Sequence, residues 1–403
     1  MRVALVLAGD IESESGGFYY DRRLRDRLRE RGHAVEIVSL PRGSYRRRLA
    51  PNLRARRLAD RLSRFDVVVE DGLAHPSVLL ANRRIDAPVV ALVHMIAWRA
   101  RSATGRGPDA ADAVERARSA LARRWAAAVE RLFLRSVDAA VYNAEETRRD
   151  AAGLGGPRRC AVAPPAGDRF DPVVAGSEIR DRARGGPLEV TFLGNVVPRK
   201  GLDVLVDALA RLDGSESDWR LTVVGDRTIA PDHVGRVEDA VAAAGIGDRV
   251  RFVGRLDDDA VAARLRETHV LAVPSRYEPF GMVYLEAMGF GCVPLATTAG
   301  GAGEFVRDGE SGVLAPPDDS RGVAAALRDL DDRDRLARMG VAARRDYEAR
   351  PGWPETLDRA IDFLAAEHAR RDGGGRRGGD GSERDGNDGS DRRRAGSRRG
   401  ERA

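Results

Sequence analysis

Residues 188–212 read LEVTFLGNVVPRKGLDVLVDALARL and contain a strand, a turn and a helix in one short segment. The apolar run over residues 188–193 predicts a buried strand, and the apolar run over residues 202–212 predicts a helix. The turn between them carries Lys200, the only lysine among the 68 lysine and arginine residues. A compact ammonium group at a strand-to-helix turn is suited to holding a phosphate. A surface lysine without a function is the alternative explanation.

The same alternation of strand and helix runs through the whole chain. In the first half we expect strands over residues 3–7, 34–40, 66–69, 89–93 and 139–142, with helices such as 20–31 and 111–136 between them. In the second half we expect strands over residues 188–193, 220–224, 250–253, 270–273, 293–296 and 312–314. Apolar strands that alternate with helices are typical of a parallel sheet covered on both faces. We therefore predict an α/β protein with two doubly wound, Rossmann-like sheets that face each other across a cleft.

The length of 403 residues also favours two domains over one core. We predict a first domain over residues 1–170, a linker over 171–187 and a second domain over 188–348. Residues 349–370 are expected to form a helix that crosses back to the first domain. Residues 371–403 are rich in Gly, Arg and Asp, and their lack of apolar side chains predicts a disordered tail.

The composition restricts where the protein acts. A run of about 20 apolar residues, as a membrane span needs, is absent from the sequence, and residues 3–8 are too short an apolar run for a signal peptide. Cys160 and Cys292 match no metal or disulfide spacing, so we expect a cytoplasmic protein. The segment from Arg42 to Arg64 (residues 42–64) contains nine arginines and one acid. Such a segment can contact an anionic membrane at its inner face, or it can be a solvated surface. Nucleic-acid binding is not expected because stacking aromatic residues are lacking.

A second informative run, PSRYEPFGMVYLEAMG, spans residues 274–289 and follows an apolar strand. Its Pro-Phe-Gly turn predicts a helix start, where unpaired backbone N–H groups can bind phosphate or sugar oxygens. Glu278 lies before this helix and Glu286 lies inside it, next to apolar residues. Glu278 could accept hydrogen bonds from a sugar ring and Glu286 from a diol such as ribose. Alternatively, Glu278 is a helix cap and Glu286 a solvated side chain.

This run, with Glu278-x7-Glu286 inside Pro-Ser-x-x-Glu-Pro-Phe-Gly, resembles the retaining glycosyltransferases of the GT-B fold, specifically glycosyltransferase family 4 (glycosyl transferases group 1). Residues 194–201 resemble that family's phosphate loop, and residues 163–168, 221–226, 250–256 and 297–304 resemble further segments of it. The resemblance covers residues 160–320 well. It covers the amino-terminal half loosely, through Ser15-Gly16-Gly17 and His94, and the final helix through Trp353.

The resemblance implies that the second domain binds a nucleotide diphosphate sugar and the first domain a glycan, lipid-linked or small-molecule acceptor. Lys200, with Arg199, would neutralise the diphosphate, Glu286 would hold the ribose, and Glu278 would hold the donor sugar. The implied catalytic residues are His94, Lys200 and Glu278. The implied donor-binding residues are Gly16, Gly17, Asn195, Arg199, Lys200, Gly225, Arg255, Glu278, Phe280, Gly281, Met282 and Glu286. The implied activity is a hexosyltransferase of cell-envelope glycan biosynthesis that retains the anomeric configuration.

Two features of the site need separate interpretation. Asn195 stands where the family usually has an arginine, and an amide cannot bind a phosphate bidentately as a guanidinium does. Arg199 is the candidate substitute. Asp257-Asp258-Asp259 has the form of a metal-binding Asp-x-Asp, but we interpret it as a helix cap. The resemblance also implies that no metal is needed, and we expect no cofactor.

Other classes of protein fit less well. Residues 194–201 lack the glycine before the lysine and the Ser or Thr after it that a P-loop needs, and no Gly-x-Gly-x-x-Gly follows the first strand. A pyridoxal-dependent phosphorylase would need Lys200 for its cofactor. A sugar-nucleotide epimerase on the same fold, or a non-catalytic partner of a glycosyltransferase, stays open as an alternative. His94 could equally be a core histidine, although its position directly after a strand favours a functional role.

Overall fold

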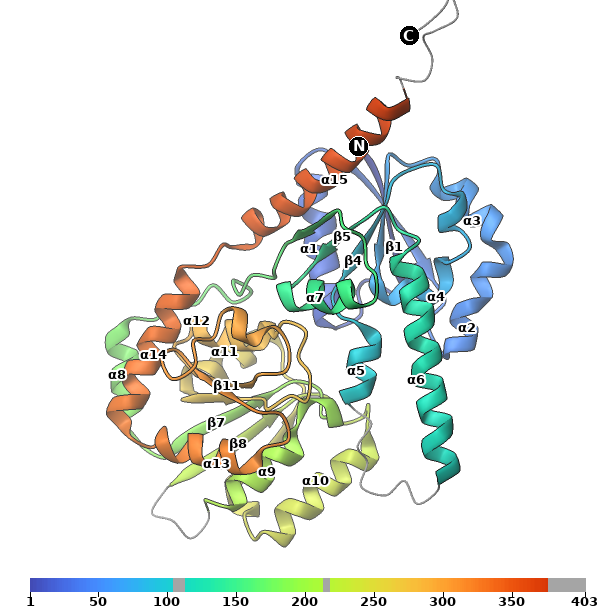
Figure 1. Cartoon of the computed structure of the whole chain (residues 1–403). Helices are drawn as coiled ribbons and strands as arrows, with labels where there is room; N and C mark the ends of the chain where they lie inside the picture. Colours follow the sequence, from blue (N-terminus) through green and yellow to red (C-terminus); the bar gives the residue numbers. More distant parts are fainter. Residues whose placement is uncertain (104–112, 213–217, 376–403) are drawn as a thin grey trace, which may run out of the picture.

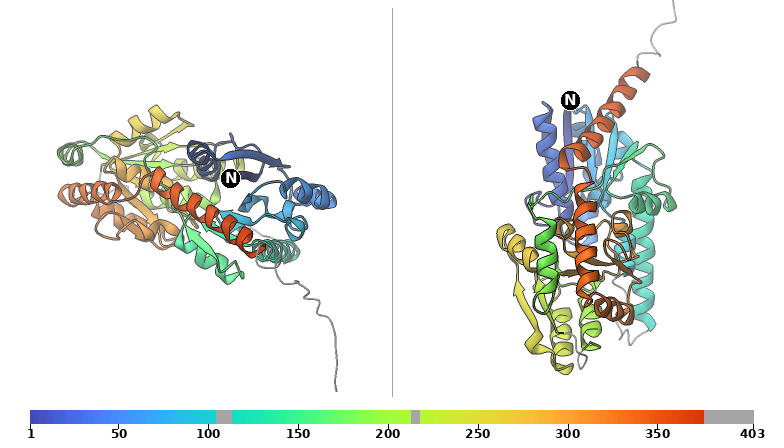
Figure 2. Two further views of the ribbon diagram at one scale, coloured as in Figure 1. Left: turned by 90° about the horizontal axis from the view of Figure 1, so that it is seen from above. Right: turned by 90° about the vertical axis from the view of Figure 1, so that its left-hand side faces the viewer.

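The computed structural model describes residues 1–103, 113–212 and 218–375. Within these residues the chain forms two lobes, each built on a six-stranded parallel sheet with helices packed against it (Figure 1). Figure 2 shows the lobes side by side, with the last helix lying along the first lobe. The predicted fold class, two doubly wound parallel sheets, is confirmed.

The sheet of the first lobe has the strand order β2-β1-β3-β4-β5-β6. Its strands are β1 (Arg2–Ala8), β2 (Ala34–Leu40), β3 (Val67–Asp71), β4 (Val89–Val93), β5 (Ala139–Tyr142) and β6 (Cys160–Val162). Its helices are α1 (Gly16–Glu30), α2 (Tyr45–Leu49), α3 (Ala55–Leu62), α4 (His75–Val78), α5 (Ala97–Ala103), α6 (Ala113–Leu134) and α7 (Glu145–Gly153). The chain reverses its direction of winding between β1 and β3, where doubly wound folds bind ligands.

The sheet of the second lobe has the order β12-β11-β10-β7-β8-β9, and its direction of winding reverses between β7 and β10. Its strands are β7 (Leu188–Leu193), β8 (Trp219–Val224), β9 (Val250–Gly254), β10 (Val270–Ala272), β11 (Val293–Thr297) and β12 (Val313–Ala315). Its helices are α8 (Gly176–Arg184), α9 (Leu202–Ala210), α10 (Pro231–Ala243), α11 (Asp258–Glu267), α12 (Met282–Gly289), α13 (Ser320–Asp329) and α14 (Arg333–Glu348). Each sheet therefore brings two loops together at its switch point, which is the place where its direction of winding reverses.

Burial on both faces explains why the strands are apolar throughout. In β1, Val3 and Leu5 lie in the cluster under α1, whereas Ala4 and Val6 lie in the cluster on the opposite face. All four side chains are fully buried. A strand covered on two sides needs no polar alternation, which is the pattern that the sequence showed.

Two segment boundaries and one strand differ from the sequence prediction. The linker predicted over residues 171–187 contains α8, whose Ile179 and Ala183 are buried and which packs against α14. Part of this segment therefore belongs to the second lobe. The short strand β6 was missed. Residues 371–375 end the last helix, and the rest of the predicted tail lies outside the described residues.

The last helix, α15 (Trp353–Gly375), leaves the second lobe and lies on α1 of the first (Figures 1 and 2). Trp353 is buried against the rings of Tyr19 and Tyr20, at centroid distances of 5.6 and 5.5 Å. Asp358 accepts two hydrogen bonds from Arg27, at 2.7 and 2.9 Å. Aromatic burial is the main stabilising term here, since partly exposed ion pairs contribute little.

A buried carboxyl group in β3 makes stability depend on pH. Glu70 is fully buried, and Asn82 donates a hydrogen bond to it at 2.8 Å. Burial raises the pKa of Glu70 to about 8, although the Asn82 hydrogen bond opposes the increase. The unfolded chain releases this proton near the usual value, so the folded state loses stability as pH rises from there to about 8.

Glu70→Gln should therefore raise the thermal midpoint at about pH 8 by roughly 2–6 °C, and it should flatten the decrease in stability between about pH 6 and pH 8. Thermal unfolding followed by circular dichroism across this range measures both effects. Glu36→Gln, at a half-exposed position of the edge strand β2 in the same sheet, is the matched control. Equal pH profiles for wild type and Glu70→Gln would contradict the prediction.

Candidate active site

The loops after β7 and β10 meet at the switch point of the second sheet. Lys200 ends a short 3-10 turn after β7, and its Nζ donates to Glu278 Oε2 at 2.6 Å. Ser275 Oγ donates to the same oxygen at 3.2 Å. Arg199 Nη1 donates to the carbonyl oxygen of Tyr277 at 2.7 Å and lies 3.4 Å from Glu278 Oε2. The structure thus brings together three of the residues that the sequence singled out.

Lys200 and Glu278 are both largely removed from water, with side-chain exposures of 11% and 12%. Burial by itself would raise the pKa of Glu278, but the charges of Lys200 and Arg199 outweigh it and lower the pKa. Burial lowers the pKa of Lys200, and Arg199 adds to that decrease while Glu278 opposes it. The two cations therefore share one carboxylate, which leaves the group with an excess of positive charge.

Glycines allow these loops to approach one another backbone to backbone. Gly201 has φ +71°, and a Cβ there would lie 2.1 Å from the carbonyl oxygen of Pro274. A Cβ at Gly225, in the loop after β8, would lie 1.9 Å from the carbonyl oxygen of Gly194. Only glycine fits at either position. The conformation of the loop over residues 194–201 thus depends on close backbone contacts that a side chain at either glycine would prevent.

The start of α12 presents backbone rather than side chains. Gly281 is its N-cap with φ +96°, and no side chain caps this end. The Phe280 side chain is buried against Phe305 at a ring distance of 5.0 Å, so only its backbone is available to a ligand. Uncapped N–H groups at a helix start are suited to binding oxygen atoms of an anion or a sugar.

Glu286 is buried inside α12 with only 3% of its surface exposed, so the alternative of a solvated side chain is wrong. Burial raises its pKa to about 7, although Arg169 opposes this increase. Arg169 Nη1 lies 3.8 Å from Glu286 Oε1, and no hydrogen bond to the carboxyl group is formed within the described parts of the chain. A buried carboxylate with unused acceptor capacity is a candidate for binding hydroxyl groups.

The amino-terminal domain contributes the opposite wall. Ser15 caps α1, which begins at Gly16. A Cβ at Gly16 would lie 3.1 Å from Met282 Cε of the second domain, and a Cβ at Gly17 would lie 3.2 Å from His94 Cδ2. The two glycines thus lie between Met282 of α12 and the imidazole ring of His94.

His94 follows β4 and is held by a partner that the sequence analysis missed. Its Nε2 lies 2.8 Å from Asp21 Oδ1, and Asp21 is fully buried in α1. Burial lowers the pKa of His94, but the charge and hydrogen bond of Asp21, together with the charge of Asp71, outweigh burial and raise it. The ring of Tyr20 packs at 5.1 Å from the imidazole. This arrangement favours an imidazolium that faces Gly17.

Two of the residues predicted to bind the donor, Asn195 and Arg255, lie at the edge of the cluster formed by Lys200, Arg199 and Glu278. Asn195 is exposed, and its side chain forms no hydrogen bond among the residues that the structure describes. Arg255 is half exposed and forms ion pairs with Glu14 of the first domain and, at 3.6 Å, with Asp226. Arg199, which lies beside Lys200 and Glu278, is better placed than Arg255 to supply the second cation.

The Asp-x-Asp segment forms a helix cap. Asp257 accepts a hydrogen bond from the backbone N–H of Ala260 at 2.9 Å and so caps α11, while Asp258 pairs with Arg169. Within the described ranges, no group of three or more His, Cys, Asp and Glu side chains is arranged to hold a metal.

Two protein-family models match the chain, one in each of its two domains. A family model for the glycosyl transferase 4-like domain matches residues 3–166, and the model for glycosyl transferases group 1 matches residues 178–346. The chain belongs to the group 1 glycosyltransferases. It is 31% identical to a D-inositol 3-phosphate glycosyltransferase of Geodermatophilus obscurus over 304 residues, which are 71% of this chain and 63% of the relative.

A second relative is the GDP-mannose-dependent alpha-(1-6)-phosphatidylinositol monomannoside mannosyltransferase of Mycobacterium tuberculosis, which is 31% identical over 58% of this chain and 63% of that protein. The chain spans between 45% and 63% of the length of these and other curated relatives that it matches.

Solved structures share the fold. A sucrose-phosphate synthase from Thermosynechococcus elongatus has a TM-score of 0.75 at 20% identity, with 92% of this chain and all of that chain covered. Anabaena HepE in complex with UDP has a TM-score of 0.68 at 19% identity, with 91% of this chain and all of that chain covered. These likenesses confirm the GT-B architecture of the group 1 glycosyltransferase.

The Asp21–His94 pair leads to a prediction about protonation. Because the pKa of His94 is raised in the folded state, its contribution to stability is present below about pH 6.5 and is lost as pH rises through the folded pKa. Asp21→Asn removes the main cause of the increase, so the pKa of His94 should fall below its usual value under the influence of burial.

NMR titration of the imidazole C–H signals measures this change, with His94→Gln to assign the resonance. His233, whose pKa burial lowers and which lies in α10 of the second domain, serves as the internal control and should not move. An unchanged His94 titration in Asp21→Asn would show that the pair does not set the protonation state.

Proposed function

We propose that this chain is a retaining hexosyltransferase that transfers a sugar from a nucleotide diphosphate donor without a metal ion. Its acceptor would be a glycan, a lipid-linked sugar or a small molecule. The observation that carries the proposal is the arrangement at the β7/β10 switch point, where Lys200 and Arg199 share the single carboxylate of Glu278 beside the uncapped start of α12. Buried Glu286 lies on the same helix.

The phosphate end of the donor would bind at Lys200. The two cations and one carboxylate leave a net positive charge, and the helix start adds backbone donors that favour an anion. When a diphosphate enters, we propose that Lys200 Nζ turns from Glu278 to a phosphate oxygen. Glu278 is then released to accept hydrogen bonds from hydroxyl groups of the donor sugar.

The nucleoside end would bind at Glu286. An ionised carboxylate accepts from both hydroxyl groups of a ribose diol, which matches a buried group with unused acceptor capacity. Glu278 lies in the loop before the start of α12 and Glu286 lies inside the helix, so we propose that one ligand spans both. This order, sugar at Glu278 and ribose at Glu286, places the diphosphate over Gly281.

The proposed reaction moves charge onto the diphosphate. The acceptor oxygen forms a bond to the anomeric carbon while the bond between that carbon and the phosphate oxygen breaks. The phosphate keeps the electron pair, and the proton released by the acceptor hydroxyl balances the additional negative charge. Cations fixed before the reaction stabilise this charge as it develops. The His94 imidazolium, held by Asp21, would lie on the acceptor side of the transferred sugar.

Support for the donor class comes from the solved HepE complex with UDP and from a relative whose name specifies GDP-mannose. That relative acts on a phosphatidylinositol monomannoside, which favours a role in cell-envelope glycan synthesis. We propose that this chain works in the cytoplasm, with peripheral membrane contact through residues 42–64. In the described residues no helix has the length and apolar character of a membrane span.

Lys200→Ala should lower kcat/KM by about 100- to 1,000-fold while the protein stays folded, because one preorganised cation at the leaving group is lost. Steady-state transfer assays with the cognate donor measure the loss, and NMR of the first product reports its anomeric configuration. Arg328→Ala, an exposed arginine of α13, is the control. Turnover like that of wild type in Lys200→Ala would remove the phosphate role, and an inverted product would remove retention.

Nucleotide affinity should depend on the ionisation of Glu286. Since the pKa of Glu286 is about 7, the carboxylate that accepts both ribose hydroxyls predominates above pH 7, so affinity should rise by about 3- to 10-fold between about pH 6 and pH 8. Glu286→Gln should abolish this dependence and weaken binding by about tenfold at pH 8. Calorimetric titration with the matching nucleoside diphosphate tests both. A parallel pH profile in the variant would assign the ribose to another group.

A further inference from the structure

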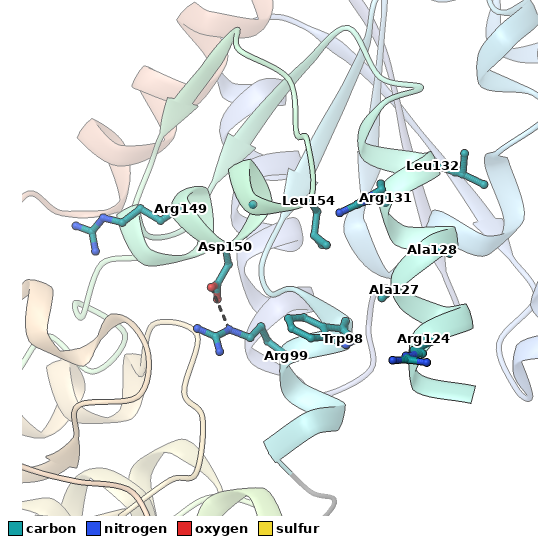
Figure 3. A pocket seen from close by; sticks show the side chains of 11 residues that line it. Trp98, Arg99, Arg124, Ala127, Ala128, Arg131, Leu132, Arg149, Asp150 and Leu154 are labelled. Atoms are coloured by element: carbon teal, nitrogen blue, oxygen red, sulfur yellow. Dashed lines mark hydrogen bonds and ion pairs between the residues drawn. The ribbon is translucent and has the colours of Figure 1, made fainter. Parts of the chain in front are cut away.

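A cavity of about 770 Å³ lies in the first domain between α5, α6 and α7 (Figure 3). None of its lining residues belongs to the catalytic or donor-binding group described above. Its floor is apolar and includes Trp98 of α5, Ala127 of α6 and Leu154, which follows α7. A cavity of this size with an apolar floor is large enough for part of an organic ligand.

Arginines surround this apolar floor. Four arginines line the cavity, Arg99, Arg124, Arg131 and Arg149, and Asp150 is the only acid among its lining residues. Arg149 pairs with Glu146, outside the cavity lining, at 2.6 Å. Asp150 pairs with Arg99 at 3.0 Å. Arg124 and Arg131 have no ion-pair partner in the described part of the chain, and Figure 3 shows Arg131 pointing from α6 toward Leu154. An apolar cavity with two uncompensated guanidinium groups is complementary to an amphiphile with an anionic group.

The cavity adjoins the active site. Asp150, on its wall, accepts a hydrogen bond from the hydroxyl of Tyr277 at 3.2 Å. Tyr277 directly precedes Glu278, the residue paired with Lys200. On the other side, Trp98 follows His94 by four residues, at the start of α5. A ligand in the cavity could therefore extend one end toward the space between His94 and Glu278.

Exposed apolar side chains on the outer surface of α6 favour a lipid over a short-chain amphiphile as the ligand of the cavity. Leu121, Trp125 and Leu132 are exposed by 70%, 48% and 49%. Their spacing of four and seven residues places them along one side of the helix. Leu132 also borders the cavity. A hydrocarbon chain longer than the cavity would thus continue along an apolar stripe rather than end in water.

We propose that this cavity is the acceptor subsite and that the acceptor is an anionic lipid. Its phosphate would bind Arg124 and Arg131, its hydrocarbon chain would lie on Trp98, Ala127 and Leu154, and its hydroxyl-bearing end would extend past Asp150 toward the donor. The inference rests on the proposed glycosyl transfer, for which it names the acceptor class.

The test is a binding titration of the full chain with three probes, measured by calorimetry. Dodecyl phosphate, below its micelle concentration, carries both features of the ligand. Inorganic phosphate carries only the charge, and dodecyl maltoside carries only the hydrocarbon chain. Dodecyl phosphate should bind at least tenfold more tightly than either of the other two.

Two variants locate the binding. Arg131→Glu reverses a charge on the cavity wall, and Ala127→Trp fills the floor. Each should weaken binding of dodecyl phosphate at least tenfold. Arg328→Glu makes the same charge change on the second domain and should leave the affinity unchanged. The thermal shift induced by the cognate nucleoside diphosphate should persist in all three variants, which shows that they fold and keep the donor site.

The outcomes separate this inference from the proposed function. Equal affinity for inorganic phosphate would mean a site for free phosphate, and equal affinity for dodecyl maltoside would mean an apolar groove without anion selectivity. Either result, or unchanged affinity in both cavity variants, overturns the inference. A nucleotide shift without amphiphile binding would refute the lipid subsite alone. The absence of any nucleotide shift in wild type would refute the donor site itself.

Discussion

The ion pair between Lys200 and Glu278 is the constraint on which the site depends. It joins the loop after β7 to the loop after β10 in a place where both side chains are largely removed from water. Separating buried charges without a replacement partner is unfavourable by several kcal/mol. A ligand that supplies its own negative charge can replace Glu278 as the partner of Lys200. The pair therefore keeps Lys200 in place for binding an anion until the donor diphosphate replaces Glu278 as its partner.

The two domains meet through polar contacts close to this pair. Glu304 of the second domain accepts hydrogen bonds from the backbone N–H groups of Glu145 and Glu146, at 3.0 and 2.7 Å. The N-cap of α7, Ala144, cannot supply this cap from its own side chain. An acidic group at a helix start is stabilised by the helix dipole as well as by hydrogen bonds. Helix α7, which also forms part of the proposed acceptor cavity, thus depends on the second domain for its first turn.

The sequence predicted the two sheets well because strands buried on both faces are apolar throughout. It placed Lys200 and Glu278 in loops that each follow a strand of the second sheet, and their common role came from the resemblance to the glycosyltransferase family. It could not show that these two side chains pair with each other, because the distance between them depends on the backbone path of both loops. It also missed Asp21 and Arg169, the charges that face His94 and Glu286. Both act across elements far apart in the chain, and neither arginine nor aspartate stands out in a sequence so rich in them. Helix α8 was mistaken for a linker because Pro and Gly surround it.

The most direct test of the account is a crystal structure of the chain with its cognate nucleoside diphosphate. The account predicts that Lys200 Nζ moves from Glu278 to within ion-pair distance of a phosphate oxygen. It also predicts that both ribose hydroxyls donate to Glu286. An intact Lys200–Glu278 pair, with the nucleotide bound elsewhere or its ribose away from α12, would contradict the account.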